Sequence, residues 1–132
     1  MTVFLDTSAL YAALDRDDVN HAAAAETYVD LLEREALLTH SYVVVETAAL
    51  AQRRLGMEAV RALADEVLPA CEIAFVDHPL HDAAVASLLA AGARDISLVD
   101  WTSFELMRRR GVTEAFAFDD DFAERGFTVL PA

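Results

Sequence analysis

Residues 4–18 read FLDTSALYAALDRDD, in which an apolar run stops abruptly at one acidic residue, Asp6. Residues 3–5 predict a short buried strand, and the spacing of Leu10 and Leu14 predicts a helix directly after it. Asp6 is therefore expected at the carboxyl edge of a strand, where ligands bind in open α/β sheets. A simpler interpretation is that Asp6 only caps the following helix.

The size and composition indicate a compact protein. The chain has 132 residues, of which 55% are hydrophobic and 25% charged, which predicts one domain spanning residues 1–132. No apolar run approaches the roughly 20 residues that a bilayer span needs, and Met1 leads straight into a strand without a basic leader. A single cysteine, Cys71, cannot form an internal disulfide. We therefore expect a cytoplasmic protein with no membrane role.

The charge balance restricts the chemistry. The formal net charge is -13, and all 10 basic residues are arginines. Such a chain repels nucleic acid at long range, so a nucleic-acid role would need local arginine patches or bound cations. The acidic excess also suits a basic protein partner. Without lysine, Walker-type phosphate binding and Schiff-base catalysis are excluded, and phosphoryl chemistry of the receiver-like or haloacid-dehalogenase-like type is disfavoured.

Apolar runs of strand length alternate with helical patterns along the whole chain. We expect strands at residues 3–5, 37–39, 73–76, 115–118 and 127–130. We expect helices after Asp6 and at residues 21–35, 41–55, 57–68, 79–91, 97–110 and 122–125. The core-facing stripe expected on the second helix consists of Ala25, Tyr28, Val29 and Leu32. The connections allow crossovers, so the pattern predicts an α/β fold with a mainly parallel five-stranded sheet covered on both faces.

Three adjacent carboxylates, residues 119–121, follow the expected fourth strand. Such a run makes sense at the carboxyl end of a strand if a cation gathers there, and the alternative is a polar turn. We expect Asp119 to face the site and Asp121 to cap the short helix after it. A parallel sheet would bring Asp6 and Asp119 to the same edge.

Two further acids belong to helices that begin near that edge. Glu46 lies on an apolar stripe, which is costly unless the carboxylate is paired or bound to a metal; the alternative is an ion pair with Arg53. Asp100 stands three residues after Ser97, which is the spacing of a capping box and offers a purely structural role. Four carboxylates in one cleft would need divalent cations, and oxygen-only ligands favour Mg²⁺ or Mn²⁺ over zinc. Such a site supports phosphodiester hydrolysis.

Four segments together carry a resemblance to a known family. They are FLDTSALYAALDRDD, YVVVETAALAQRRLG, SLVDWTSFELMRRRG and AFAFDDDF, in this order along the chain. The chain resembles PIN-domain ribonucleases, specifically VapC-type toxins of type II toxin-antitoxin systems. The resemblance implies a PIN-like three-layer sandwich and a Mg²⁺-dependent (or Mn²⁺-dependent) endoribonuclease with the catalytic and metal-binding quartet Asp6, Glu46, Asp100 and Asp119. It also implies silencing by a cognate basic antitoxin, and a homodimer.

Other residues are candidates for supporting roles. The family often keeps a hydroxyl residue just after the third acid, where this chain offers both Thr102 and Ser103. Ser8 and Asp121 stand close to the first and fourth acids as further supporting residues. The candidate contacts to RNA phosphates are Arg53, Arg54 and Arg108. A non-catalytic alternative is an acidic PIN-like module whose carboxylates only bind a basic partner.

Overall fold

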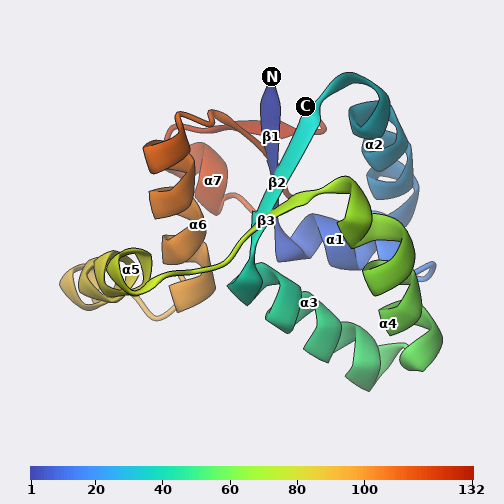
Figure 1. Cartoon of the computed structure of the whole chain (residues 1–132), viewed down its shortest axis with the longest axis horizontal. Coiled ribbons are helices and arrows are strands. Elements are labelled where there is room, and N and C mark those ends of the chain that lie inside the picture. Colours follow the sequence, from blue (N-terminus) through green and yellow to red (C-terminus); the bar gives the residue numbers. More distant parts are fainter.

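A five-stranded sheet forms the centre of the computed structural model, which describes residues 1–132 (Figure 1). The strands are β1 (Thr2–Leu5), β2 (Ala36–His40), β3 (Glu72–Ala74), β4 (Glu114–Phe116) and β5 (Thr128–Leu130). Their order in the sheet is β3-β2-β1-β4-β5, and every neighbouring pair is parallel. The predicted α/β fold with a parallel sheet is confirmed. Because all strands run in one direction, their carboxyl ends share one edge, with β1 in the middle.

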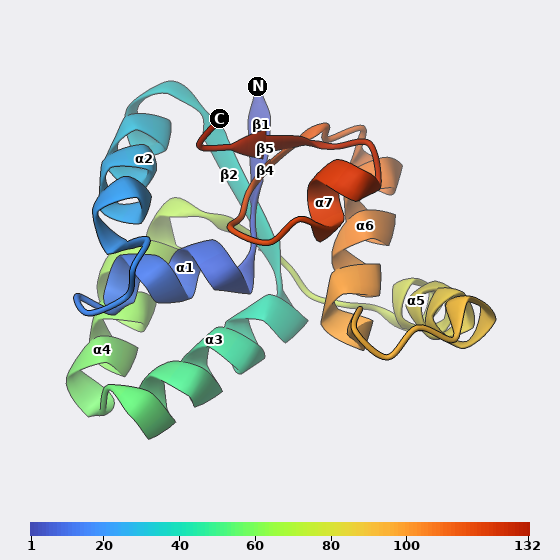
Figure 2. The same ribbon diagram turned by 180° about the vertical axis from the view of Figure 1, so that it is seen from behind.

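Helices cover both sides of the central strands. They are α1 (Thr7–Leu14), α2 (His21–Arg34), α3 (Ser41–Arg54), α4 (Met57–Ala62), α5 (His78–Ala91), α6 (Leu98–Arg110) and α7 (Asp121–Glu124). Figures 1 and 2 show α1, α2 and α4 on one side and α5, α6 and α7 on the other. None of the helices combines the length and the apolar character that a bilayer span requires.

Two predicted strands end earlier than expected. β3 ends at Ala74, and Phe75 lies outside the sheet with 78% of its surface exposed. The backbone N–H of Val76 donates to the Ser41 hydroxyl (2.9 Å), so it is satisfied without a sheet partner. β4 likewise ends at Phe116 rather than at residue 118. In both places the chain leaves the sheet at its carboxyl edge, two residues before the end of the expected strand.

Two helices also differ from the predicted pattern. The helix expected at 57–68 ends at Ala62 and continues as a π-helical turn (Leu63–Val67) and a 3-10 turn (Leu68–Ala70). On α2 the buried residues are Ala24 and Leu31, whereas Val29 is 56% exposed. The expected stripe on α2 is thus rotated by one position, because this helix packs mainly against α1.

Aromatic side chains between α6, α7 and β5 form a large part of the core. The ring of Phe104 on α6 is fully buried, and its centroid lies 5.0 Å from that of Phe122 and 5.6 Å from that of Trp101. Both pairs have edge-to-face geometry, which is favourable for aromatic rings. This packing attaches α6 to the sheet and so determines where the acidic residue in its first turn lies.

We predict that Phe104→Ala lowers the free energy of unfolding by about 3–5 kcal/mol, because it leaves a cavity and removes both ring contacts. Phe75→Ala is the matched control, since the same truncation at an exposed ring should change that free energy by less than about 0.5 kcal/mol. Urea unfolding followed by circular dichroism measures both. Similar losses in the two variants would contradict this account of the core.

Candidate metal centre

Asp6 lies at the junction of β1 and α1 and is almost fully buried, with 2% of its surface exposed. Its carboxylate accepts hydrogen bonds from the backbone N–H of Ser8 (3.1 Å) and from the Ser8 hydroxyl (2.6 Å). Asp6 therefore caps α1, but capping is not shown to be its only role. One oxygen accepts both bonds, so Ser8 leaves the second carboxylate oxygen free. Capping and ligand binding are compatible here.

Ser8 connects the first acid to the loop that carries the fourth. Its hydroxyl donates to Asp6 and accepts from the backbone N–H of Phe118 (2.9 Å), which precedes Asp119. Together with the backbone bond from Asp6 N–H to the Phe116 carbonyl (3.0 Å), this holds the ends of β1 and β4 together. The structure thus gives Ser8 a definite supporting contact.

The prediction that Asp121 caps the short helix α7 is wrong. Asp121 is itself the first residue of the helix, and its backbone N–H donates to the carboxylate of Asp119 (3.2 Å). Asp120 precedes the helix, and its side chain makes no capping bond. Asp119 therefore orders the start of α7, because its side chain reaches an N–H two residues ahead that would otherwise be unpaired.

Asp100 lies in the first turn of α6 and completes a capping box. The Ser97 hydroxyl accepts from Asp100 N–H (3.1 Å), and the Asp100 carboxylate accepts from Ser97 N–H (3.0 Å). The structural role proposed for Asp100 from its spacing is confirmed. As with Asp6, the capping bond uses one carboxylate oxygen and fixes the direction of the other.

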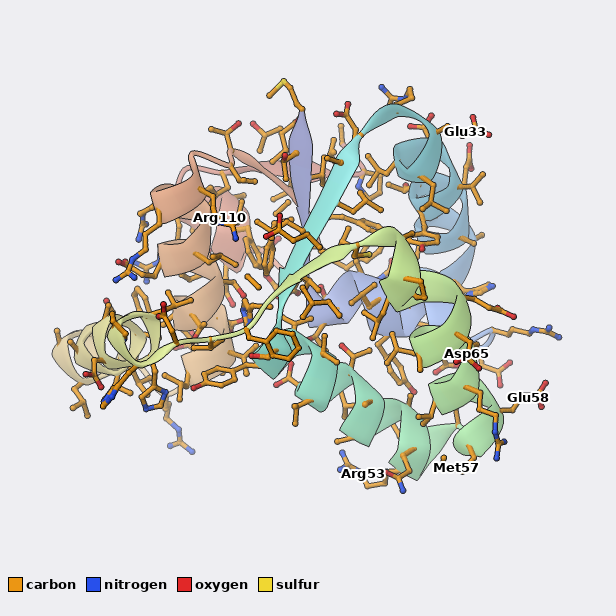
Figure 3. The ribbon with its side chains drawn as sticks, viewed as in Figure 1. Glu33, Arg53, Met57, Glu58, Asp65 and Arg110 are labelled. Carbon is orange, nitrogen blue, oxygen red and sulfur yellow. The ribbon has the colours of Figure 1, made fainter.

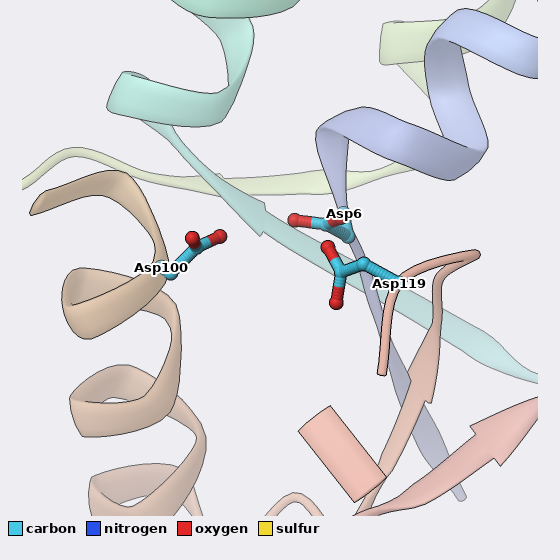
Figure 4. A group of neighbouring side chains, drawn as sticks. All are labelled: Asp6, Asp100 and Asp119. Atoms are coloured by element: carbon cyan, nitrogen blue, oxygen red, sulfur yellow. The ribbon is translucent and has the colours of Figure 1, made fainter. Parts of the chain in front are cut away.

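Asp6, Asp100 and Asp119 meet at the carboxyl edge of the sheet (Figure 4). Each offers one carboxylate oxygen, and these three atoms lie within 4.8 Å of one another. They come from the end of β1, the start of α6 and the loop after β4. Three oxygen ligands at this spacing fit a hard divalent cation. The group therefore has the chemistry of a metal centre.

The electrostatics of the group support this conclusion. Burial, together with the negative charges of Asp119 and Asp100, raises the pKa of Asp6 to about 7, although the bonds from Ser8 oppose the shift. Burial and the nearby charges of Asp100 and Asp121 raise the pKa of Asp119 to about 6. Burial and the charge of Asp100 also raise the pKa of Asp121. Asp6, Asp119 and Asp121 are thus harder to ionise than free aspartates, an effect that a bound cation would reverse.

Glu46, the remaining member of the expected quartet, does not belong to this group of three. It lies half-buried in the second turn of α3 and has no hydrogen bond or salt bridge. The ion pair with Arg53 that was considered from the sequence is not formed. The buried stripe of α3 consists of Val43, Thr47 and Ala51, so Glu46 lies beside the packed face and not within it. A role for Glu46 in metal binding stays a prediction.

The two hydroxyl residues after Asp100 point away from solvent. Thr102 donates to the Leu98 carbonyl (2.8 Å), and Ser103 donates to the Val99 carbonyl (3.0 Å), so neither bonds to the acids. Ser103 has a second partner, the ring of His40 (2.8 Å), which is completely buried at the end of β2. His40 was given no role in the sequence analysis. Its place at the end of a strand and directly before a helix could have indicated that it caps this helix.

The arginines proposed to contact phosphate are all exposed. The guanidinium of Arg54 lies 5.5 Å from the centre of the Tyr11 ring, and that of Arg108 lies 5.6 Å from the Phe127 ring. Arg53 lies at the far end of α3, about 18 Å along the helix from its first residue (Figure 3). None of the three forms a salt bridge, unlike Arg109 and Arg110, which pair with glutamates.

Comparison with known proteins reveals similarity along nearly the whole chain. A model of the PIN domain matches residues 3–128. The 23S rRNA-specific endonuclease VapC20 of Mycobacterium tuberculosis, from strains CDC 1551 and H37Rv, is 33% identical over 129 residues, which cover 97% of each protein. The crystal structure of VapC20, a sarcin-ricin loop cleaving toxin, matches with a TM-score of 0.86 at 31% identity and 96% coverage of both chains.

Two more distant structures share the fold. VapBC2 from Rickettsia felis, bound to a DNA fragment from their promoter, matches with a TM-score of 0.71 at 13% identity over 98% of this chain and 97% of that one. FitAcB from Neisseria gonorrhoeae matches with a TM-score of 0.69 at 16% identity over 98% of this chain and 96% of that one. At such identities the agreement concerns the fold alone.

We predict that Asp6→Asn stabilises the metal-free protein at pH 8. Because the pKa of Asp6 is raised from 3.8 to about 7 on folding, the stability of the wild type falls as pH rises from about 4 to about 7, and the full loss is present at pH 8. Asparagine keeps the cap but carries no charge, so the free energy of unfolding should rise by on the order of 1–3 kcal/mol at pH 8. The gain should shrink towards pH 4, where both residues are neutral.

Urea unfolding in EDTA at pH 4, 6 and 8 measures this effect. Asp120→Asn is the matched control, because Asp120 is exposed and belongs to the same acidic run. A destabilised Asp6→Asn variant at pH 8 would contradict the repulsion described above.

Proposed function

The chain belongs to the PIN-domain family, and we propose that it is a divalent-cation-dependent endoribonuclease acting as the toxin of a toxin-antitoxin pair. The observation that carries this proposal is the approach of three carboxylate oxygens, from Asp6, Asp100 and Asp119, to within 4.8 Å of one another. Residues 1–132 would form a single PIN domain, and the reaction would take place in the cytoplasm, where its RNA substrate is found.

The metal centre would work through the position of its carboxylates. Asp6, Asp100 and Asp119 would bind Mg²⁺ or Mn²⁺, since their donor atoms are all oxygens, and Glu46 would complete the quartet. When bound, the cation supplies Lewis acidity for the attack of water on a phosphodiester. The protein residues keep the ligands in place: Ser8 holds Asp6, and the capping box holds Asp100. Asp121, close to Asp100, would support the site electrostatically.

The substrate we propose is 23S ribosomal RNA at its sarcin-ricin loop. VapC20, which is 33% identical by sequence and 31% identical in the structural match, is described as 23S rRNA-specific and as sarcin-ricin loop cleaving, and the similarity covers at least 96% of both chains. Bound cations would also reduce the repulsion between a protein of net charge -13 and an anionic substrate. Arg53, Arg54 and Arg108 are the phosphate contacts we propose, because none of them is engaged by a carboxylate.

The partners we propose follow from charge and family. A cognate basic antitoxin would complement the acidic surface and block the metal centre. The functional toxin would be a homodimer.

The competing function, an acidic module that binds a basic partner without catalysis, predicts neither metal binding nor RNA cleavage. The raised pKa values of Asp6 and Asp119 favour the nuclease, because carboxylates that only bind a basic partner need not be buried together.

We predict that Asp6→Asn, Asp100→Asn and Asp119→Asn each slow RNA cleavage by at least about 100-fold, because each removes a charged ligand. Asp120→Asn is the matched control and should keep activity within about 2-fold, since its side chain is exposed and outside the group. Incubation with purified ribosomes in Mg²⁺, followed by primer extension across 23S rRNA, measures the rate and locates the cut.

EDTA should abolish the cleavage, and excess Mg²⁺ should restore it. Cleavage at the wild-type rate by the folded Asp6→Asn variant would refute the assignment of the site. Cleavage of other RNAs, with 23S rRNA left intact, would refute only the proposed substrate.

We also predict that Mn²⁺ affinity falls below pH 7. The ligands must lose their protons to bind the ion, and the pKa values of Asp6 and Asp119 are about 7 and about 6 in the metal-free protein. Between pH 8 and pH 5.5 the dissociation constant should rise by about 10-fold or more. Calorimetry at both pH values, in buffers of different ionisation enthalpy, measures the affinity and the protons released. Equal affinity at both pH values would show that these carboxyl groups are not the ligands.

A further inference from the structure

His40 uses both nitrogens of its buried ring. Nδ1 accepts hydrogen bonds from the backbone N–H groups of Tyr42 (3.2 Å) and Val43 (3.3 Å), so this nitrogen carries no hydrogen. The hydrogen of the neutral ring is therefore on Nε2, which donates to the hydroxyl of Ser103 (2.8 Å). That hydroxyl donates in turn to the Val99 carbonyl (3.0 Å). The direction of every bond in this chain is thus determined.

These bonds place His40 between two helices. It is the last residue of β2 and the N-cap of α3, while its other nitrogen reaches α6. Ser103 stands three residues after Asp100, so the two side chains lie on the same side of α6. A bond that holds Ser103 against the end of β2 therefore restrains the rotation of α6 and the direction in which Asp100 points.

The surroundings of His40 favour the neutral ring. The Phe4 ring lies 5.6 Å from it and the Tyr42 ring 6.0 Å, and no carboxylate pairs with it. Burial lowers the pKa of His40 to about 4. The acceptor at Nδ1 and the donor at Nε2 are therefore both present at neutral pH.

A second bond ties the same helix end to α5. The hydroxyl of Tyr42, in the first turn of α3, lies 2.6 Å from Nδ1 of His81 on α5. The N-terminus of α3 thus contacts both α5 and α6 through polar side chains, and it directly follows the strand next to β1. The position of α6 is determined from this side as well as from the aromatic core.

We propose that His40 is a positioning residue of the metal centre, because its bond to Ser103 fixes α6 so that Asp100 faces Asp6 and Asp119. The inference rests on the proposed function for its effect on metal binding. Helix capping alone would not require histidine, since asparagine caps helices well. The ring, however, reaches Ser103 on a helix that is 63 positions away in sequence, which asparagine is too short to do while capping.

Two variants remove the bond between His40 and Ser103, one by changing the donor and one by changing the acceptor. His40→Asn keeps a side-chain acceptor for the cap of α3 but loses the donor to Ser103, and Ser103→Ala loses the acceptor and keeps the histidine. Thr47→Val is the matched control: its hydroxyl is buried on α3 without any hydrogen-bond partner, and valine has nearly the same shape. Circular dichroism and thermal unfolding establish which variants are folded at the temperature of the assays.

The first measurement needs no metal. Amide hydrogen exchange over residues 98–103 should be faster in His40→Asn and in Ser103→Ala than in the wild type, and unchanged in Thr47→Val. In the second, Mn²⁺ binding followed by calorimetry should weaken by about 10-fold in the two variants, as for other residues that orient metal ligands. The kcat for RNA cleavage should fall with KM unchanged. The double variant should bind Mn²⁺ about as weakly as the single ones, because all three lack the same bond between His40 and Ser103.

Unchanged exchange over residues 98–103 in either folded variant would overturn the inference, and so would wild-type Mn²⁺ affinity in both. Additive losses in the double variant would also overturn it, since they would assign the two side chains to separate tasks. Failure of the wild type itself to bind Mn²⁺ or to cleave RNA would instead refute the proposed function. The exchange measurement would then still decide whether His40 positions α6.

Discussion

The mutual repulsion of three carboxylates is the constraint around which this structure is built. Asp6, Asp100 and Asp119 approach within 4.8 Å at the edge of the sheet, and burial of this group raises the pKa of Asp6 to about 7. Such an arrangement opposes folding when the groups are charged and no cation is bound. The fold therefore has to supply the compensating stability elsewhere, mainly through its apolar core and the hydrogen bonds that hold each acid.

Each acid is held by the backbone at the start of a helix. Asp6 caps α1, Asp100 closes the capping box of α6, and Asp119 bonds the first N–H of α7. A helix N-terminus favours negative charge, so these positions reduce part of the repulsion as well as fixing geometry. The same bonds leave other carboxylate oxygens free to bind a ligand. A parallel sheet makes this possible, because it directs its strand ends and the following helices towards one edge.

Much of the fold and part of the site could be predicted locally. The alternation of strands and helices, the caps at Asp6 and Ser97, and the parallel sheet followed from apolar spacing and from residues a few positions apart. Details that depend on packing were wrong: the inner stripe of α2 is rotated, Phe75 lies outside β3, and Asp121 does not cap α7. The local sequence pattern could not predict these points, because they depend on neighbouring elements. The side of α2 that is buried, the residue at which β3 leaves the sheet and the residue at which α7 begins are all decided by packing.

The sequence by itself determined that acidic residues follow buried strands and open helices, since strand periodicity and helix capping act over a few residues. Only the tertiary structure decided which acids meet. It grouped three of the four expected carboxylates and left Glu46 outside them, and it paired His40 with Ser103 on a distant helix. Such pairings depend on how the helices dock on the sheet. That docking results from the packing of the whole core, which no single segment encodes.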